Sequence, residues 1–461
     1  MRWPTAGALA LAAMLAGTLE PWPLEAAAKR AVSKKASAKS SARKKSGGKK
    51  SATRHTPPKP HVTDEERAES KEAVQESLWS ATNAGIQNPA ALVPFYEMLY
   101  QSSQGKGEPL RVLHFGDSHT ASDDWPGAIR ARFQSAFGNG GPGFTHAGRP
   151  FVGYRRFDSK AGMSRGWTPS GLLNREGDGM NGLSGVSVSA KRAGETITLK
   201  AEGAMVGVFY YSQPDGGALR LEVDGVETDV IQTTGENGAG YYRRKIAPGI
   251  HDFTLRTLSD NPIRVYGWVV ENEGGVTWET LGINGAQADL MLGWNEELLR
   301  SHIENRDPAL IVLAYGTNEA RRRDWTYDSY KQAFTQVLRR LREFAPTASI
   351  LVIGPPDQSM RVSRRWTTPE GVDHVLAAQH DAALENGCAF WDVRAVMGGK
   401  GAMRQWVQAG LAQGDFVHFT SPGYKALGET LYDLMMGQYG IFTAVRRQWI
   451  GTAPNGPSSK D

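Results

Sequence analysis

The sequence predicts an α/β protein in which a parallel sheet with helix-covered faces is interrupted by an inserted antiparallel β-sandwich of the jelly-roll type. In residues 274–445, apolar strand patterns alternate with helical patterns, which is typical of parallel sheets. Between residues 150 and 273 the pattern changes to short alternating runs separated by turns rich in Gly, Asp and Asn. Hydrophobic residues make up 40% of the 461 residues, enough to build a sizeable core.

Residues 62–149 are expected to hold N-terminal helices and the first strand–helix unit of the parallel sheet. Thr63 is followed three residues later by Glu66, the pattern of a capped helix start. A second short helix is expected over Ala91 to Gln101. The apolar run from Arg111 to Phe115 predicts a buried first strand.

Residues 150–273 are expected to form the inserted sandwich, because short strand patterns recur there without a long helical period. Turn sequences such as Asp224-Gly225 and Asn237-Gly238 separate several of these runs. The expected strands are Gly185–Ala190, Thr196–Ala201, Met205–Tyr211, Ala218–Val223, Tyr241–Ile246, His251–Thr257 and Val265–Glu271.

Residues 274–445 are expected to complete the parallel sheet. The expected strands are Ala309–Tyr315, Ser349–Gly354 and Ala389–Val393. The expected helices lie near Ala286–His302, Tyr327–Phe344 and Pro369–Glu385. Because the first strand precedes residue 150, the β-rich region is predicted to be an insertion within one α/β domain.

The ends of the chain differ in composition from its middle. Residues 1–28 combine Arg2, an apolar stretch and small residues, which predicts a signal peptide and export to the periplasm or cell surface. Residues 29–61 are expected to be a disordered basic linker, and residues 446–461 a disordered tail. No later segment is apolar for the roughly 18 residues that a membrane span requires, so none is expected.

Charge is concentrated in the linker. Residues 29–60 carry twelve Lys and Arg residues and no acid, so the rest of the chain is net acidic although the whole has a formal charge of +5. This distribution argues against a nucleic-acid-binding surface on the folded part. The linker is interpreted either as a solvated spacer or as a contact with anionic envelope polymers.

Cysteine and metal chemistry are not expected. Cys388 is the single cysteine, so no intramolecular disulfide or zinc–cysteine site is possible, and its apolar surroundings favour a place in a strand core. No spacing of His and carboxylate residues suggests a metal site, and no cofactor is expected.

Four separated segments carry residues suited to acyl-transfer chemistry. Ser118 follows the first strand and precedes a helical pattern from Asp123 to Phe137, so its hydroxyl is expected at the carboxyl edge of the sheet. In the segment Gly282-Ile-Asn-Gly285-Ala, a glycine can direct its N–H at developing negative charge. Asn318 can donate its side-chain N–H to the same charge.

The fourth segment holds Asp415 and His418. At this spacing the carboxylate can fix the imidazole tautomer, and the other ring nitrogen can take the proton of a serine hydroxyl. Any one of the four segments is common turn sequence, but all four fall at strand ends or loops of one predicted sheet.

In this order, the segments resemble the SGNH (GDSL-like) hydrolase superfamily. Four motifs are similar to those of its peptidoglycan O-acetylesterase branch. They are His114-Phe-Gly-Asp-Ser-His-Thr120, Leu281-Gly-Ile-Asn-Gly-Ala-Gln287, Tyr315-Gly-Thr-Asn-Glu-Ala320 and Val417-His-Phe-Thr420. The resemblance implies a flavodoxin-like three-layer α/β/α domain, with an insert similar to a carbohydrate-binding module. It covers residues from about 85 to 440.

The resemblance also implies a role for each candidate residue. Ser118 would be the nucleophile and His418 the base oriented by Asp415, while the oxyanion hole would combine Ser118 N–H with Gly285 and Asn318. Gly285 is preferred to its neighbouring glycine because it stands just before the expected helix.

The implied function is an exported serine esterase that removes O-acetyl groups from a cell-wall polysaccharide, with peptidoglycan as the expected partner. Two alternatives stay open: an O-acetyltransferase with the same residues, and a non-catalytic wall-binding protein. Arg321-Arg-Arg323 is interpreted as a solvated face or a contact for a substrate anion. Aromatic residues of the insert are interpreted as sandwich core or as platforms for sugar rings: Tyr210, Tyr211, Tyr241, Tyr242 and Trp268.

Overall fold

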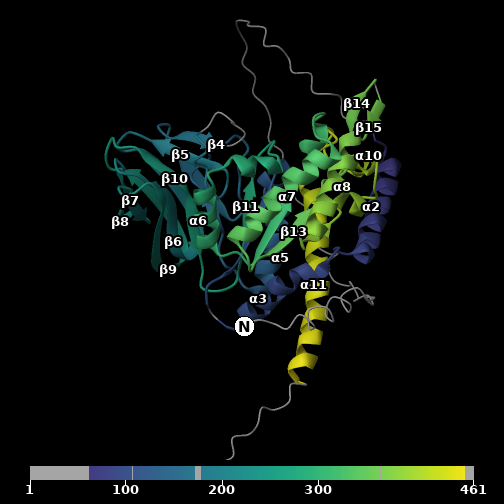
Figure 1. The fold of residues 1–461 in the computed structure, drawn as a ribbon, viewed down its shortest axis with the longest axis horizontal. Coiled ribbons are helices and arrows are strands. Elements are labelled where there is room, and N and C mark those ends of the chain that lie inside the picture. The colour runs from purple at the N-terminus through teal and green to yellow at the C-terminus, as the bar shows by residue number, and fades with distance from the viewer. Residues whose placement is uncertain (1–61, 106, 172–177, 364, 452–461) are drawn as a thin grey trace, which may run out of the picture.

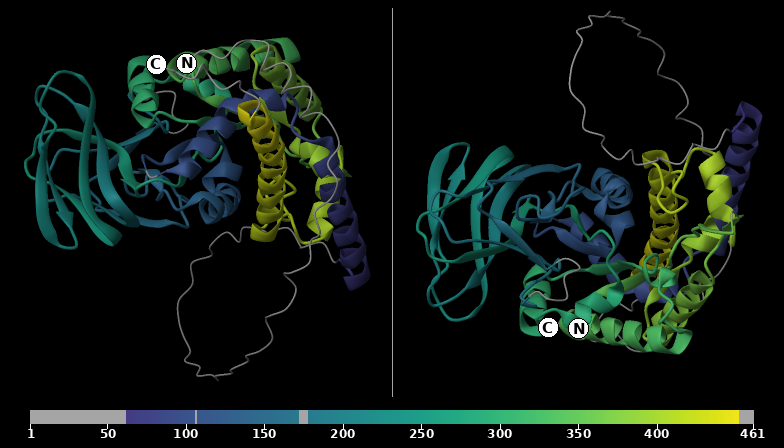
Figure 2. Two further views of the ribbon diagram at one scale, coloured as in Figure 1. Left: turned by 90° about the horizontal axis from the view of Figure 1, so that it is seen from below. Right: turned by 90° about the horizontal axis from the view of Figure 1, so that it is seen from above.

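The computed structural model describes residues 62–105, 107–171, 178–363 and 365–451. A helix-covered sheet and an antiparallel β-domain lie beside each other, as Figures 1 and 2 show. The expected signal peptide (1–28) and basic linker (29–61) lie outside the described residues. Within the described ranges, no helix combines the length and apolar character needed to cross a membrane.

The central sheet contains five parallel strands in the order β11-β1-β12-β13-β16. Their bounds are β1 Leu110–Gly116, β11 Val276–Gly282, β12 Leu310–Ala314, β13 Ser349–Ile353 and β16 Ala389–Trp391. All their residues are buried, which explains the continuous apolar runs in the sequence. The second strand in chain order pairs on one side of the first and the third on the other, so the topological switch point lies at β1.

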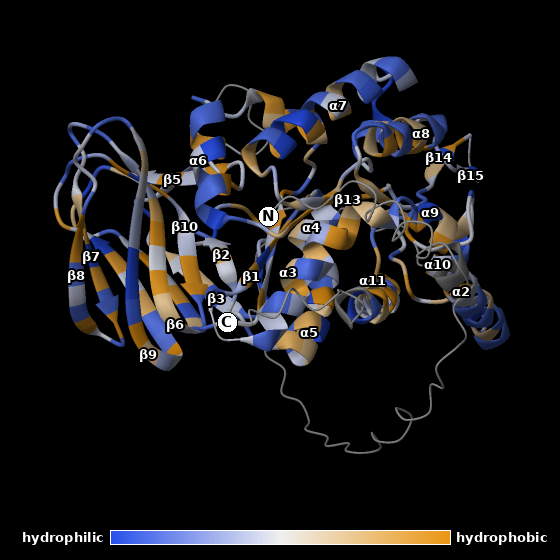
Figure 3. Cartoon of the chain, turned by 60° about the horizontal axis from the view of Figure 1, so that its bottom comes forward, coloured by the Kyte–Doolittle hydropathy of each residue, from blue (hydrophilic) through white to orange (hydrophobic). Residues whose placement is uncertain are grey.

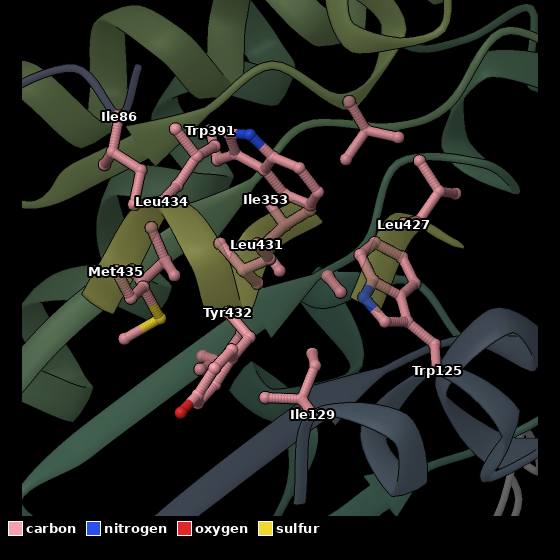
Figure 4. Close-up of a cluster of buried hydrophobic side chains, with 14 of the residues drawn as sticks. Ile86, Trp125, Ile129, Ile353, Trp391, Leu427, Leu431, Tyr432, Leu434 and Met435 are labelled. Carbon is pink, nitrogen blue, oxygen red and sulfur yellow. The ribbon is translucent and has the colours of Figure 1, made fainter. Parts of the chain in front are cut away.

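Helices cover both faces of this sheet. The helical segments are α2 Asp64–Ala84, η1 Pro89–Leu92, α3 Val93–Gln104, α4 Ser118–Ala121, α5 Asp124–Phe137, η2 Ala288–Gly293, α6 Glu296–Arg306, η3 Glu319–Arg321, α7 Tyr327–Phe344, α8 Glu370–Glu385, α9 Val393–Val396, α10 Ala402–Gln408 and α11 Ser421–Gly451. Alternate strand residues point to opposite faces. Val112 belongs to the core beneath α5 and α11, and its neighbour Leu113 to the core beneath α6, α7 and α8. Figure 4 shows part of the first core, where Trp125 of α5 and Leu427 of α11 lie near Trp391.

A nine-stranded antiparallel sheet forms the inserted β-domain. Its strands are β2 Gly143–His146, β3 Ser159–Met163, β4 Thr168–Gly171, β5 Val186–Ala190, β6 Thr196–Ser212, β7 Ala218–Val223, β8 Val226–Gln232, β9 Gly238–Thr257 and β10 Ile263–Glu271. Hydrophilic and hydrophobic residues alternate along several of them (Figure 3). A separate hairpin, β14 Met360–Val362 with β15 Arg365–Thr367, lies outside both sheets.

The long pair β6 and β9 makes this sheet a sandwich. The first half of β6 pairs with β3 and its second half with β10, and the register shifts between Gly203 and Met205. Side chains from both halves of β6, including Leu199 and Val208, belong to one buried cluster. The β6–β9 pair therefore runs through both layers and encloses a core between them.

The sandwich also shares a core with the parallel-sheet domain. Met205, Phe209 and Val269 belong to the same buried cluster as Leu313 of β12 and Leu299 of α6. Because these side chains face away from the sandwich interior, the insert packs directly on the parallel-sheet domain. The insert is consequently not an independent module on a flexible link.

Buried charges reinforce this junction. Arg306 at the end of α6 forms a 2.6 Å ion pair with Glu271 of β10 and a shorter one with Glu279 of β11. Arg111 of β1 lies 2.7 Å from Glu271. Burial raises the pKa of Glu271, but the two arginines outweigh it and hold the pKa at about 2. The network thus joins the sandwich to two strands of the parallel sheet.

The predicted fold class is confirmed, with corrections to its elements. The sandwich starts at β2, before the predicted boundary at residue 150. The tail predicted from residue 446 is helical up to Gly451, because α11 continues past the core that it covers. Residues 452–461 lie outside the described residues.

Several strands and helices also differ from their predicted extents. The predicted strands Thr196–Ala201 and Met205–Tyr211 are parts of β6, and Tyr241–Ile246 and His251–Thr257 are parts of β9. Each strand bends from one layer into the other while β6 and β9 stay hydrogen-bonded to each other. The patterns missed β2, β3, β4, β8, β11, β14 and β15. The predicted helix over Ala91–Gln101 is η1 followed by α3, and that over Ala286–His302 is η2 followed by α6, with a break where Asn295 caps α6.

Replacing Arg306 by methionine is expected to lower the free energy of unfolding by about 3–5 kcal/mol, because two buried carboxylates lose their shared partner. Arg300, on the same helix, pairs with Glu296 and Glu343 at the surface. Its replacement by methionine should cost less than about 1 kcal/mol. Urea unfolding of the two variants measures the difference, and equal losses would contradict the role assigned to the buried network.

Candidate active site

The strand register gathers three of the four candidate segments at one edge of the sheet. Gly116 at the end of β1 pairs with Gly282 at the end of β11 and with Ala314 at the end of β12. Ser118 and Asn318 follow their strands within a few residues. The segments therefore meet at the carboxyl edge beside the switch point, where ligands bind in open α/β sheets.

Ser118 is the first residue of α4 and directly follows the tight turn that leaves β1. Asp117 caps α4, with its Oδ1 accepting from His119 N at 2.9 Å. A Cβ at Gly116 would lie 2.1 Å from Thr120 Oγ1, so only glycine lets the turn approach the strand end this closely. Burial raises the pKa of Asp117 to about 6, although hydrogen bonds to its carboxylate oppose this shift. Its contacts fix the turn and leave the serine hydroxyl facing the cleft.

A hydrogen-bond relay connects Ser118, His418 and Asp415. Ser118 Oγ lies 2.9 Å from His418 Nε2, and His418 Nδ1 lies 2.7 Å from Asp415 Oδ2. An ionised carboxylate only accepts, so Nδ1 carries the hydrogen and Nε2 is left to accept from the serine hydroxyl. Asp415 Oδ1 also accepts from His418 N at 3.0 Å, which orients the carboxylate.

The hydrogen bonds of the relay shift the pKa values of His418 and Asp415. The hydrogen bond to Asp415 raises the pKa of His418, although burial opposes the shift. Burial raises the pKa of Asp415, but the hydrogen bonds from His418 and from the backbone outweigh it and hold the pKa at about 2. Asp415 is therefore ionised across the physiological range and stabilises a positive charge on the imidazole.

An aromatic stack supports the loop that carries Asp415 and His418. Phe416 between them has φ of +61°, a left-handed conformation that a bulky residue rarely adopts. The Trp366 ring of β15 stacks on Phe416 with a centroid distance of 4.0 Å, and Ser359 N donates to Phe416 O at 2.9 Å. The β14–β15 hairpin thus holds the turn in which the carboxylate and the imidazole face each other.

Gly285 and Asn318 both line the cleft that contains the relay. The lining residues are Ser118, Asn284, Gly285, Thr317, Asn318, Arg321, Asp415, Val417 and His418. Asn318 Nδ2 donates to Ala286 O at 2.9 Å, which fixes the amide and leaves its second hydrogen free. Gly282 does not line the cleft, and a Cβ there would lie 2.3 Å from Ala121 N.

Glu319 is a buried residue that the sequence analysis did not assign. Its carboxylate accepts from Ala288 N at 2.9 Å, from Gly316 N at 3.0 Å and from Tyr330 Oη at 3.2 Å. Burial raises its pKa to about 7. These bonds tie the loop after β11 to the loop after β12, so they set the distance between Gly285 and Asn318. Its position directly after Asn318 was the available signal, but an acid there is also a common helix start.

Two other histidines near the cleft, His114 and His119, are buried and hydrogen-bonded to aromatic side chains. Trp278 Nε1–H donates to His114 Nδ1 at 3.1 Å, and His119 Nδ1 lies 2.9 Å from Tyr424 Oη. Burial lowers the pKa of both imidazoles to about 3, so each is neutral. Among the described residues, no group of three His, Cys or carboxylate side chains is placed to hold a metal ion.

The cysteine and the aromatic candidates of the insert do not line the cleft. Cys388 is buried, which raises the pKa of its thiol to about 11 and keeps it protonated. Trp268 of the insert is fully buried in the sandwich core. Tyr241 contacts Ser301 through its hydroxyl, and Tyr242 donates to Asp229. Tyr210 and Tyr242 are partly buried against the sandwich core, and Tyr211 and Tyr241 against the core shared with the parallel sheet.

Comparison with protein families agrees with this architecture. Residues 250–426 match the model of the GDSL-like lipase/acylhydrolase family. The chain carries an SGNH (GDSL-like) hydrolase domain. This hydrolase is a carboxylic ester hydrolase. The matched range includes Gly285, Asn318, Asp415 and His418, whereas Ser118 precedes the inserted sandwich that divides the domain.

Solved structures give a further comparison for the hydrolase. A structure described as "Peptidoglycan O-acetylesterase in action, 5 min" is 27% identical, with a TM-score of 0.65, and the alignment covers 75% of this chain and 96% of that one. A family two carbohydrate esterase from Cellvibrio japonicus is 9% identical, with a TM-score of 0.26, over 61% of this chain and 99% of that one. No curated protein sequence matches the chain.

The relay predicts how His418 titrates. We expect its pKa to lie above the ordinary value of about 6.5, and Asp415→Asn to lower it because the stabilising negative charge is lost. Below this pKa the imidazole is cationic and cannot accept the serine proton, so activity should fall as the pH drops through it. Nitrogen chemical shifts of labelled histidine measure the titration in both proteins. An unchanged pKa in Asp415→Asn would contradict the relay.

Proposed function

We propose that this hydrolase removes O-acetyl groups from a cell-wall polysaccharide, peptidoglycan, through an acyl-enzyme on Ser118. The observation that carries the proposal is the Ser118–His418–Asp415 relay, with contacts of 2.9 and 2.7 Å, at the cleft of an SGNH domain. The substrate is inferred from the likeness to the peptidoglycan O-acetylesterase structure. A protein that only binds the wall has no need of such a relay.

In the first half of the reaction, Ser118 Oγ attacks the acetyl carbonyl carbon while His418 Nε2 takes the hydroxyl proton. Asp415 stabilises the imidazolium and holds its ring orientation without taking the proton itself. The imidazolium then protonates the sugar oxygen as the C–O bond of the ester breaks. The acetyl group is left on Ser118 and the glycan hydroxyl is released.

The negative charge on the acetyl oxygen requires hydrogen-bond donors in the cleft. The proposed donors are Gly285 N–H, Ser118 N–H and the free amide hydrogen of Asn318. The hydrogen bonds of Glu319 hold the loops of Gly285 and Asn318 together. Such preorganised donors cost little reorganisation during the reaction. Removing one donor typically lowers kcat about 10²–10³-fold in serine hydrolases.

In the second half, water attacks the acetyl carbonyl while His418 accepts its proton, and acetate leaves Ser118. A sugar hydroxyl in place of water would make the enzyme an O-acetyltransferase with the same residues. We favour hydrolysis because the structural neighbour is described as an esterase. Free acetate as the product, with no new ester on an added glycan, separates the two reactions.

The proposed place of action is the cell envelope. Residues 1–28 are the proposed export signal, and the twelve basic residues between positions 29 and 60 are proposed to contact anionic envelope polymers. The sandwich is proposed to lie along the polymer near the cleft, since Asn284 in the cleft donates to Val152 O, between β2 and β3 of the insert, at 3.3 Å.

Replacing Ser118 by alanine is expected to lower acetate release from O-acetylated peptidoglycan by about 10³-fold or more, because the acyl-enzyme cannot form. His418→Ala should cost a similar factor, since the two residues act as one unit. Ser80→Ala, at an exposed position of α2, is the matched control and should keep full activity. A folded Ser118→Ala protein with normal turnover would falsify the proposal.

Deleting residues 29–60 should leave hydrolysis of 4-nitrophenyl acetate unchanged, because none of the five residues proposed for catalysis belongs to this segment. Adsorption to isolated cell envelopes should fall at low salt, where attraction between opposite charges is screened least. The comparison uses the mature protein with and without the segment over a range of salt concentrations. Equal adsorption of the two forms would favour a spacer.

A further inference from the structure

Arg321 lines the cleft but takes no part in the proposed acyl transfer. It ends η3, three residues after Asn318, and is exposed. Its Nε donates to Gln358 Oε1 at 2.7 Å, and the fully buried Gln358 donates through Nε2 to Thr317 O at 3.0 Å. The Nε end of the Arg321 guanidinium is therefore held by the Gln358 side chain, which Thr317 holds in place beside the cleft.

Among the described residues, the positive charge of Arg321 has no counterion. In the part of the chain that the structure describes, no carboxylate lies within ion-pair distance of it, and its two terminal nitrogens form no hydrogen bond. Its neighbour Arg322 differs, because it pairs with Asp324 and lies over the Trp325 ring. The free edge of the Arg321 guanidinium is thus available to a ligand.

The rest of the cleft lining does not compensate this charge. Asp415 is the one acidic residue in the lining, and its carboxylate is occupied by His418 and by two backbone N–H groups. Arg321 also acts on His418 through space, lowering the pKa that the Asp415 hydrogen bond raises. The cleft therefore presents an uncompensated cation next to the residues proposed to react with the ester.

A guanidinium with two free terminal nitrogens matches the geometry of a carboxylate better than that of a neutral sugar hydroxyl. We propose that Arg321 binds a substrate carboxylate, so that the enzyme selects O-acetylated glycans that carry a carboxylate close to the acetylated sugar. This inference rests on the proposed esterase function and narrows its substrate class. In peptidoglycan the carboxylate can come from the lactyl group or from the stem peptide.

The test compares kcat/KM on two acetylated polymers that differ in charge. Acetylated polygalacturonate carries a carboxylate on every sugar unit, acetylated or not, and acetylated xylan with its uronic acids removed carries none. We expect Arg321→Gln to lower the ratio of kcat/KM on the anionic polymer to that on the neutral polymer by at least about tenfold. Arg321→Lys should retain part of the preference as a point charge without the two-nitrogen edge.

Arg323→Gln is the matched control, because Arg323 is exposed two residues further along the chain and does not line the cleft. It should leave the ratio unchanged. In the wild type, added salt should lower kcat/KM on the anionic polymer more than on the neutral one, and Arg321→Gln should remove this difference.

The outcomes separate this inference from the function on which it rests. An unchanged ratio in Arg321→Gln, or an equal loss on both polymers, overturns the role of Arg321 while the esterase function stands. If the wild type hydrolyses neither polymer nor 4-nitrophenyl acetate, the proposed function fails first. A defect on acetylated peptidoglycan strands stripped of peptides assigns the lactyl carboxylate, and a defect confined to intact strands assigns the stem peptide.

Discussion

The parallel pairing of β1 with β11 and β12 is the constraint on which the rest of this structure depends. It places the carboxyl ends of three strands at one level, with Gly116 between Gly282 and Ala314. The loops that follow must then leave the sheet side by side, whatever the sequence distance between them. The proposed nucleophile, Ser118, therefore lies beside the loops of the proposed hydrogen-bond donors, Gly285 and Asn318, and buried Glu319 connects those two loops.

The inserted sandwich preserves the pairing of β1 with β11. Its chain leaves after α5 and returns directly into β11, so it must fit the gap between neighbouring strands of the parallel sheet. A shared apolar core and the buried Arg306 network close this junction. Burying those carboxylates without arginine partners would be costly, so the two parts of the molecule are expected to fold together. Any selection of polymer by the insert is therefore built into the rigid body of the enzyme.

The loop of Asp415 and His418 is held from outside the sheet. It precedes α11, which packs on α5, and it is held by the Trp366–Phe416 stack. Hydrogen bonds within the loop orient the Asp415 carboxylate. The distance from His418 to Ser118 depends instead on the packing of α5, α11 and the β14–β15 hairpin, which are separate segments of the chain. This arrangement explains why a DxxH tetrapeptide carries little information by itself and becomes specific once its position is known.

The sequence by itself determined the fold class, the insertion and the five residues proposed for catalysis, because apolar periodicity and turn residues are local properties of the chain. It did not reveal β11, whose buried Glu279 breaks an apolar pattern, or the continuity of β6 and β9 through both layers. It left Arg321 undecided between a solvated residue and a ligand contact. Only the tertiary structure decided the two strand questions and showed that Arg321 lines the cleft without a counterion among the described residues, since strand pairing, burial of a charge and ion pairing depend on contacts between residues far apart in the chain.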